Sequence, residues 1–122
     1  TFATDAQKDD RKVAGDVRIG DGPVVGIGPT YHTALAGLLL QTAEAEKMPV
    51  QRQVRSRGTG TCAWAMRMSR SGAAVAQLSI PLRYMHSPVE LLSLEDAERT
   101  IDLLCATLRN IPADISLLPP QP

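Results

Sequence analysis

Short apolar runs bounded by glycine or proline alternate with longer stretches of helical periodicity along this sequence. Residues 23–28 (PVVGIG) form one such run, whose length and valine content predict a buried strand. Residues 31–47 then place Leu35, Leu38, Leu39 and Thr42 at helical spacing, and Pro49 closes the segment. This alternation of strands and helices predicts an α/β fold, a layered domain with a parallel or mixed sheet covered by helices.

The next predicted strand, residues 50–55, has the pattern of a strand with one wet face. Val50 and Val54 alternate there with the polar residues Gln51, Gln53 and Arg55, so the polar side chains are expected in solvent. A turn at residues 57–61 follows, and Thr61 could cap a short helix over residues 62–71 that ends at Gly72. Residues 74–80 are predicted to form a third strand, which Pro81 stops.

The final helix is the clearest element of the sequence. Ser93 opens a Ser-x-x-acid capping pattern, and the apolar positions after it fall on one stripe: Leu94, Ala97, Ile101, Leu104, Leu108 and Ile111. The other segments are less regular. Residues 1–4 are predicted as a short strand, the polar stretch up to residue 22 as a solvated loop, and residues 113–122 as a proline-rich tail. Residues 1–112 therefore form one α/β domain, or part of one.

Composition and charge narrow the range of partners. Thirteen acidic and thirteen basic residues balance, which gives no electrostatic reason to favour nucleic acid or an anionic membrane. No apolar run approaches the length of a bilayer span. Cys62 and Cys105 lie far apart without metal-ligand spacing, which favours free thiols in a cytoplasmic protein. The sequence opens at Thr1 without a methionine or a signal-peptide pattern, so we expect a processed chain or part of a longer one.

Few residues carry recognisable chemistry on spacing alone. His32 lies near a helix start, where a solvent-exposed or capping role is expected. His86 follows a predicted strand, in the kind of loop where ligands collect in α/β sheets; metal binding, proton transfer and a purely structural role are all open. The turn at residues 58–61 could cradle a phosphate or be a plain tight turn. Three arginines, Arg52, Arg55 and Arg57, could contact an acidic ligand or form a solvated face.

Three stretches, read together, resemble one peptidase family. They are TFATD at residues 1–5, GTGTCA at residues 58–63 and SIPLRYMHSPVE at residues 79–90. In this order they are similar to the glutamyl and tetrahedral (TET) aminopeptidases, metallopeptidases also called cellulase M or endoglucanase. The similarity spans essentially the whole chain, as the C-terminal third of the catalytic domain, and the RYxHSP stretch is its most specific part.

This resemblance implies a longer bacterial or archaeal cytoplasmic enzyme with a β-rich domain inserted in its catalytic domain, assembled into dimers and dodecamers. Two divalent metals, zinc or cobalt, would activate a water that attacks the N-terminal bond of short peptides, while a glutamate takes the proton. His86 matches the family's last metal ligand, and Gly60, Thr61, Cys62 and Arg83 fall in stretches expected beside the active site. Cys62 stands where the family usually has an aspartate, which puts the contacts of that position in doubt.

The resemblance places the other metal ligands and the general base before Thr1. The leading hypothesis is therefore a fragment of a metal-dependent aminopeptidase that is inactive as this chain alone and binds no metal stably. The alternative is a non-catalytic α/β binding or assembly module derived from the same fold. A polysaccharide hydrolase would need two carboxylates flanking a sugar, and none is marked here. Self-association is expected, because a catalytic domain cut at Thr1 exposes a sheet edge and apolar helix faces.

Overall fold

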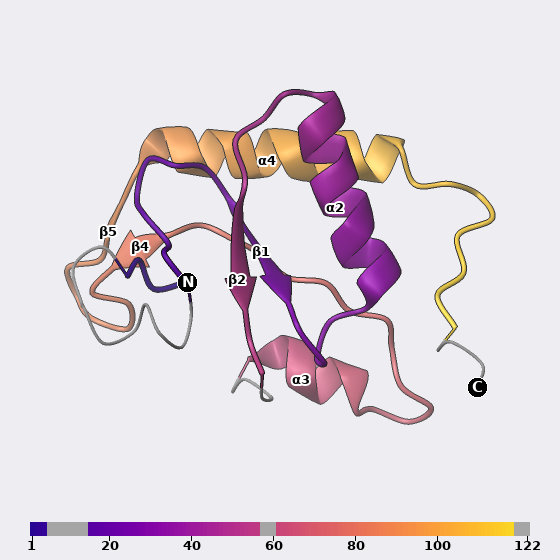
Figure 1. The fold of residues 1–122 in the computed structure, drawn as a ribbon. Coiled ribbons are helices and arrows are strands. Elements are labelled where there is room, and N and C mark those ends of the chain that lie inside the picture. Colours follow the sequence, from indigo (N-terminus) through magenta and orange to yellow (C-terminus); the bar gives the residue numbers. More distant parts are fainter. Residues whose placement is uncertain (5–14, 57–60, 119–122) are drawn as a thin grey trace.

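The computed structural model describes residues 1–4, 15–56 and 61–118. Its elements, in chain order, are β1 (Val24–Ile27), α2 (Thr33–Ala45), β2 (Gln51–Val54), α3 (Cys62–Arg67), β3 (Leu78–Ser79), β4 (Leu82–Arg83), β5 (Leu91–Leu92) and α4 (Leu94–Arg109), as Figure 1 shows. In this part of the chain no helix combines the length and apolarity needed to cross a membrane.

A mixed sheet in the order β2-β1-β3 forms the centre of the fold. The strands β1 and β2 are parallel, with Val25 opposite Arg52, because α2 carries the chain back to the start of the sheet. The short β3 pairs with β1 in the antiparallel direction. The predicted α/β fold with a parallel or mixed sheet is therefore confirmed, as are the buried strand within residues 23–28 and the helix within residues 31–47.

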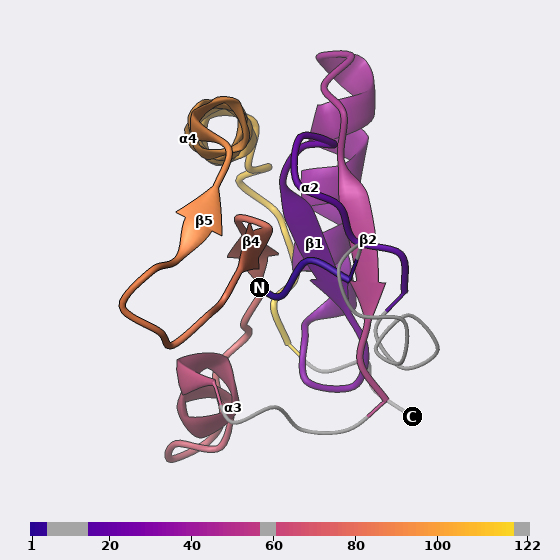
Figure 2. The ribbon, with the colours of Figure 1, turned by 90° about the vertical axis from the view of Figure 1, so that its left-hand side faces the viewer.

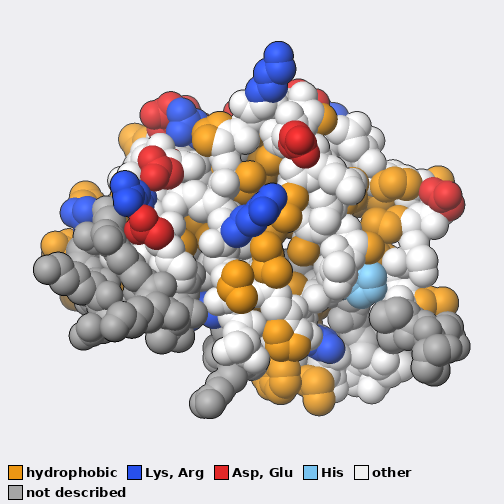
Figure 3. All heavy atoms as spheres, in the orientation of Figure 1, with side chains coloured by type: hydrophobic (Ala, Val, Ile, Leu, Met, Phe, Trp, Pro, Cys, Tyr) orange, Lys and Arg blue, Asp and Glu red, His pale blue; other side chains and the backbone are white. Residues whose placement is uncertain are grey.

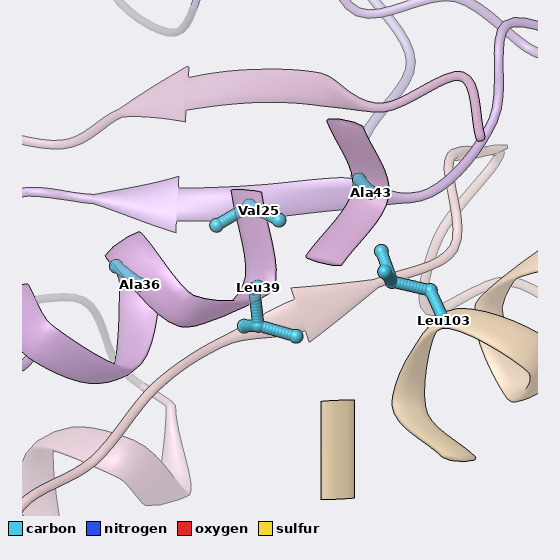
Figure 4. Packing of buried hydrophobic residues seen from close by; sticks show 5 residues of the cluster. All are labelled: Val25, Ala36, Leu39, Ala43 and Leu103. Atoms are coloured by element: carbon cyan, nitrogen blue, oxygen red, sulfur yellow. The ribbon is translucent and has the colours of Figure 1, made fainter. Parts of the chain in front are cut away.

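The hydrophobic core lies where α2 and α4 meet the same face of the sheet. Val25 on β1 packs with Ala36, Leu39 and Ala43 on α2 and with Leu103 on α4 (Figure 4). Two of the three α2 residues in this cluster are alanines, so the helix backbone can approach the strand closely. Leu39, expected in the apolar stripe of this helix, is buried, whereas Leu35 and Leu38 are only half-buried.

The strand β2 has one exposed face, but it is the opposite face from the one predicted. Gln53 is fully buried, whereas Val54 is 57% exposed. The cause is the N-terminal segment, which covers the polar face of the strand: the Thr1 hydroxyl donates a hydrogen bond to Gln53 Oε1 over 2.8 Å. The side chain of Gln51 likewise exchanges hydrogen bonds with the backbone of Arg18, so backbone groups take the place of water around the Gln51 amide.

The described part of the predicted solvated loop, residues 15–22, is mostly exposed, but Val17 within it is buried. The short strand at residues 1–4 is confirmed only as an isolated parallel bridge between Phe2 and Leu82. Thr4 is hydrogen-bonded to the segment that precedes β1: its hydroxyl accepts a hydrogen bond from the amide of Val17. The side chain of Val17 is fully buried. Residues 5–14 of the predicted loop lie outside the described residues.

Two further elements are shorter than predicted. Thr61 occupies the N-cap of α3 without a side-chain capping hydrogen bond, and the helix ends at Arg67, before a turn that reaches Gly72. The predicted strand at residues 74–80 is regular only in β3, although the carbonyls of Val75 and Gln77 still accept hydrogen bonds from the amides of His32 and Gly26. The hairpin of β4 and β5 was not predicted.

The helix α4 begins at the predicted cap, where the Ser93 hydroxyl accepts a hydrogen bond from the amide of Asp96. The carboxylate of Asp96 is fully buried and binds two other amides, those of Gly20 at 2.6 Å and Gly22 at 2.9 Å. Figure 2, looking along α4, shows the helix over β4 and β5 and apart from β2. Its predicted apolar stripe faces away from the described core, because Leu94, Ile101, Leu104, Leu108 and Ile111 are all exposed.

Two neighbouring leucines test this orientation of α4. Leu103 is fully buried and Leu104 is 45% exposed. We predict that Leu103→Ala lowers the free energy of unfolding by about 2–5 kcal/mol, because it leaves a cavity in the core. Leu104→Ala should change it by about 0.5 kcal/mol or less at low protein concentration. Urea unfolding of both variants is the measurement, and equal losses would mean that α4 is rotated from the orientation described.

Candidate functional site

His86 lies in the loop that closes the hairpin of β4 and β5. Register pairs Leu82 with Leu92 and Arg83 with Leu91, so residues 84–90 form the connection and both of its ends are fixed by strand pairing. His86 is exposed. In the described part of the chain its ring makes no hydrogen bond, so both imidazole nitrogens are accessible to a ligand.

The backbone of this loop is strained at two places. Tyr84 has φ of 58° and His86 has φ of 66°, in the left-handed region that non-glycine residues rarely adopt. Each such residue costs about 1–2 kcal/mol and persists only where its surroundings hold it. Two contacts do so here. The Ser87 amide donates to the Tyr84 carbonyl over 3.1 Å, and the His86 amide donates to Glu90 Oε1 over 2.7 Å.

The first residue of the chain lies beside this hairpin. The Thr1 carbonyl accepts a hydrogen bond from the Leu82 amide, and its amino group donates to the Ile80 carbonyl over 2.8 Å. Burial lowers the pKa of this amino group, the charge of Arg55 lowers it further, and Glu90 raises it. The start of the chain, the end of β2 and the loop carrying His86 therefore share one region, marked by the N-terminus in Figure 1.

The other predicted site residues are divided between two places. Arg83 is the last residue of β4, close in sequence to His86. Thr61 and Cys62 stand at the start of α3, which Figure 1 shows apart from the hairpin, and Gly60 lies outside the described residues. Cys62 and Cys105 are both free thiols, as predicted, and both are exposed. Hydrophobic side chains reach the surface around α3, where Trp64, Met66 and Met68 are exposed (Figure 3).

The second histidine occupies a different environment. His32 is the N-cap residue of α2 but makes no side-chain capping hydrogen bond, and its Nδ1 is buried without a partner among the described residues. Its Nε2 lies 3.5 Å from the Leu118 carbonyl oxygen. His32 is therefore half-buried beside the C-terminal segment, and its ring does not play the capping role that the sequence suggested as one alternative.

Arg52, one of the arginines singled out in the sequence, lines an open groove between α2 and β2. The groove has a volume of about 470 Å³ and is lined by Gly37, Leu40, Gln41, Glu44, Met48, Val50 and Arg52. A carboxylate and a guanidinium both border it, so the groove has no single charge preference for an acidic ligand.

The donor set for a metal is incomplete in this part of the protein. Among the described residues, no group of three or more histidine, cysteine, aspartate or glutamate side chains converges as a metal site would require. The exposed imidazole of His86 fits the role of one ligand, since it needs no displacement of an existing partner. A complete site would require further donors from outside the described residues.

Glu90 is the functional candidate that sequence reasoning missed, although it ends the quoted motif. The pattern gave no indication that its carboxylate returns to the amide of His86, four residues earlier. The available signal was an acidic residue four positions after a candidate ligand. Gln53 was missed because its polarity placed it in solvent.

Comparison with known proteins decides the family. The sequence pattern of the M42 glutamyl aminopeptidases matches residues 1–103. The chain belongs to the M42 glutamyl aminopeptidase family. The lysyl aminopeptidase of Pyrococcus furiosus is 41% identical to this M42 chain over 93 residues, which are 76% of the chain and 27% of that protein. The predicted family resemblance is thus confirmed.

Solved structures of M42-like peptidases share the fold. An aminopeptidase from the archaeon Desulfurococcus kamchatkensis matches with a TM-score of 0.75 at 30% identity, over 90% of this chain and 32% of its own. The Pyrococcus horikoshii TET1 peptidase, which can assemble into a tetrahedron or a large octahedral shell, matches with a TM-score of 0.60 at 32% identity, over 78% of this chain and 28% of its own. This M42 chain spans 27% to 28% of the lengths of the curated relatives it matches.

Proposed function

We propose that this chain forms part of a metal-dependent aminopeptidase that removes N-terminal residues from peptides, with His86 as one of its metal ligands. The observation that carries the proposal is the match to the M42 family over residues 1–103, which includes the loop of His86. That loop presents an exposed imidazole on a backbone held in a strained conformation. Strained backbone of this kind concentrates at ligand-binding and catalytic sites.

The metals of such an enzyme, zinc or cobalt, supply polarisation of the peptide carbonyl and a water of lowered pKa. The part of this chain in that chemistry is to present His86 as a neutral imidazole, whose free nitrogen lone pair is the metal ligand. Thr1 and Arg55 lie in the same region of the structure. We also assign Arg83 and the turn with Gly60, Thr61 and Cys62 to the surroundings of the active site, on the family resemblance of their stretches.

In this proposal, the remaining metal ligands and the general base belong to sequence outside the chain. This agrees with the match to the lysyl aminopeptidase, which covers only 27% of that protein. The chain alone would then bind no metal stably and hydrolyse no peptide. The proposed setting is the bacterial or archaeal cytoplasm, which suits two exposed free thiols. The alternative, a non-catalytic binding or assembly module of the same fold, would lack metal-dependent turnover even in a polypeptide of the relatives' length.

The two histidines of the chain provide a test with a matched control. In a polypeptide of the relatives' length, His86→Ala should lower the retained zinc or cobalt and the kcat for aminoacyl p-nitroanilides. The loss should be at least the roughly 10–100-fold that removal of a residue supporting a metal ligand costs. His32→Ala should leave both quantities unchanged, since His32 lies at the start of α2 and makes no capping hydrogen bond. Metal content by mass spectrometry and steady-state kinetics are the measurements.

Circular dichroism of each variant controls for folding, which should survive because His86 is exposed. Full metal content and unchanged kcat in His86→Ala would remove the assigned ligand and, with it, the proposed mechanism for this chain. Turnover absent from the unaltered polypeptide, despite full folding and added metal, would favour the binding module.

We further propose that the chain by itself associates with a second copy through the exposed face of α4. Ile101, Leu104 and Leu108 form a continuous apolar row there, and Leu94 extends it toward the exposed Leu91 and Leu92 of β5. Monomeric proteins rarely leave apolar rows of this kind exposed. The Pyrococcus horikoshii relative, which assembles into large shells, supports a tendency to associate in this family.

Sedimentation velocity over a range of concentrations tests this association. The unaltered chain should show a sedimentation coefficient that rises with concentration, because pairing removes the row from water. The double variant Ile101→Lys, Leu108→Lys should stay monomeric, whereas Glu46→Lys, an exposed charge change at the end of α2, should behave like the unaltered chain. A monomer at every concentration, or association that is equal in all three proteins, would exclude this interface.

A further inference from the structure

The backbone of His86 is in an uncommon conformation and is contacted by one side chain. His86 is a non-glycine residue with φ of 66°, and its direction from the hairpin follows from that backbone angle. If the backbone relaxed to an extended or right-handed conformation, the Cβ atom of His86 would leave the chain in a different direction. A contact that fixes the backbone amide of His86 therefore also sets the direction of its imidazole.

The carboxylate of Glu90 holds that amide. Glu90 Oε1 lies 2.7 Å from the His86 nitrogen, within the range of a charge-assisted hydrogen bond. The other contacts inside the loop are between neutral groups and are longer: 3.1 Å from the Ser87 amide to the Tyr84 carbonyl, and 3.3 Å from the Val89 amide to the Ser87 hydroxyl. Neutral hydrogen bonds have roughly half the strength of charge-assisted ones, so Glu90 makes the strongest of these contacts.

The position of Glu90 in the hairpin suits it to hold the loop. It immediately precedes β5, where Leu91 pairs with Arg83 of β4, so strand pairing fixes the backbone next to Glu90. The Glu90 side chain then extends across the loop and accepts a hydrogen bond from the amide of His86, four positions earlier. A hydrogen bond from a side chain at the paired end of a hairpin limits the conformations of the loop more than a contact between two loop residues would.

We infer that Glu90 is a positioning residue for the metal ligand His86: its carboxylate holds the His86 backbone in the left-handed conformation that directs the imidazole toward the metal. This inference rests on the proposed function, in which His86 binds a metal. Residues that orient metal ligands typically contribute 10–100-fold to metal affinity. Glu90 would act through the backbone of His86, whereas most such residues act through the second ring nitrogen of the ligand.

Substitutions of Glu90 separate this role from a direct one. Glu90→Ala removes the acceptor, whereas Glu90→Gln keeps a carbonyl oxygen that can accept from the His86 amide. Glu98→Ala, an exposed carboxylate on α4, is the control. In the metal-free chain, Glu90→Ala should accelerate hydrogen exchange of the His86 amide, while Glu90→Gln and Glu98→Ala should preserve its protection.

Cobalt binding gives the second readout, through the visible absorption of Co²⁺ titrated into a polypeptide of the relatives' length. Glu90→Ala should weaken Co²⁺ binding by about 10–100-fold, and Glu90→Gln should restore most of the affinity. Unchanged exchange of the His86 amide in Glu90→Ala would overturn the inference. So would a Glu90→Gln variant that keeps the protected amide but binds Co²⁺ as weakly as Glu90→Ala, because Glu90 would then act on the metal directly.

Failure of the proposed function gives a different result. If His86→Ala binds Co²⁺ as tightly as the unaltered polypeptide, His86 is not a ligand and Glu90 positions nothing for the metal. The exchange measurement on the metal-free chain is independent of that outcome, so it still shows whether the contact between Glu90 and His86 exists in solution.

Discussion

The buried carboxylate of Asp96 binds the amides of Gly20 and Gly22, joining the first turn of α4 to the segment that enters β1. Gly22 has φ of 93°, and a Cβ atom there would lie 2.5 Å from the Pro49 carbonyl oxygen, so the bend fits only glycine. A buried carboxylate is tolerated because hydrogen bonds satisfy it and because it lies at a helix N-terminus. These two hydrogen bonds connect segments that are more than seventy residues apart in sequence.

The position of the candidate site follows from these hydrogen bonds of Asp96. The β4–β5 hairpin ends at Leu92, directly before the cap of α4, so fixing the first turn of α4 also fixes one end of the hairpin. The other end is fixed by the hydrogen bonds between Leu82 and the residues around Phe2. His86 thus lies on a short loop whose two ends are held by the N-terminal residues and by α4. A ligand side chain requires such support to keep its geometry.

Sequence periodicity predicted β1, α2 and the α4 cap because each depends on local pattern and on burial against one core. It failed for β2, where Gln53 is buried because a distant segment covers it, a contact that no local pattern contains. It also could not indicate that the regular stripe of α4 faces outward from the described core. For the site, the motif around His86 led to the family, whereas the strained backbone and the contact with Glu90 are three-dimensional properties that spacing does not encode.

In the proposed function, this M42 chain contributes His86 to a metal centre completed by residues outside it. The most direct measurement is a crystal structure of a polypeptide of the relatives' length grown with zinc, with anomalous diffraction recorded at the zinc absorption edge. We expect an anomalous peak about 2.0–2.1 Å from a ring nitrogen of His86, with the Glu90 carboxylate hydrogen-bonded to the His86 amide. Zinc peaks held entirely by other residues, with the His86 ring in solvent, would contradict it.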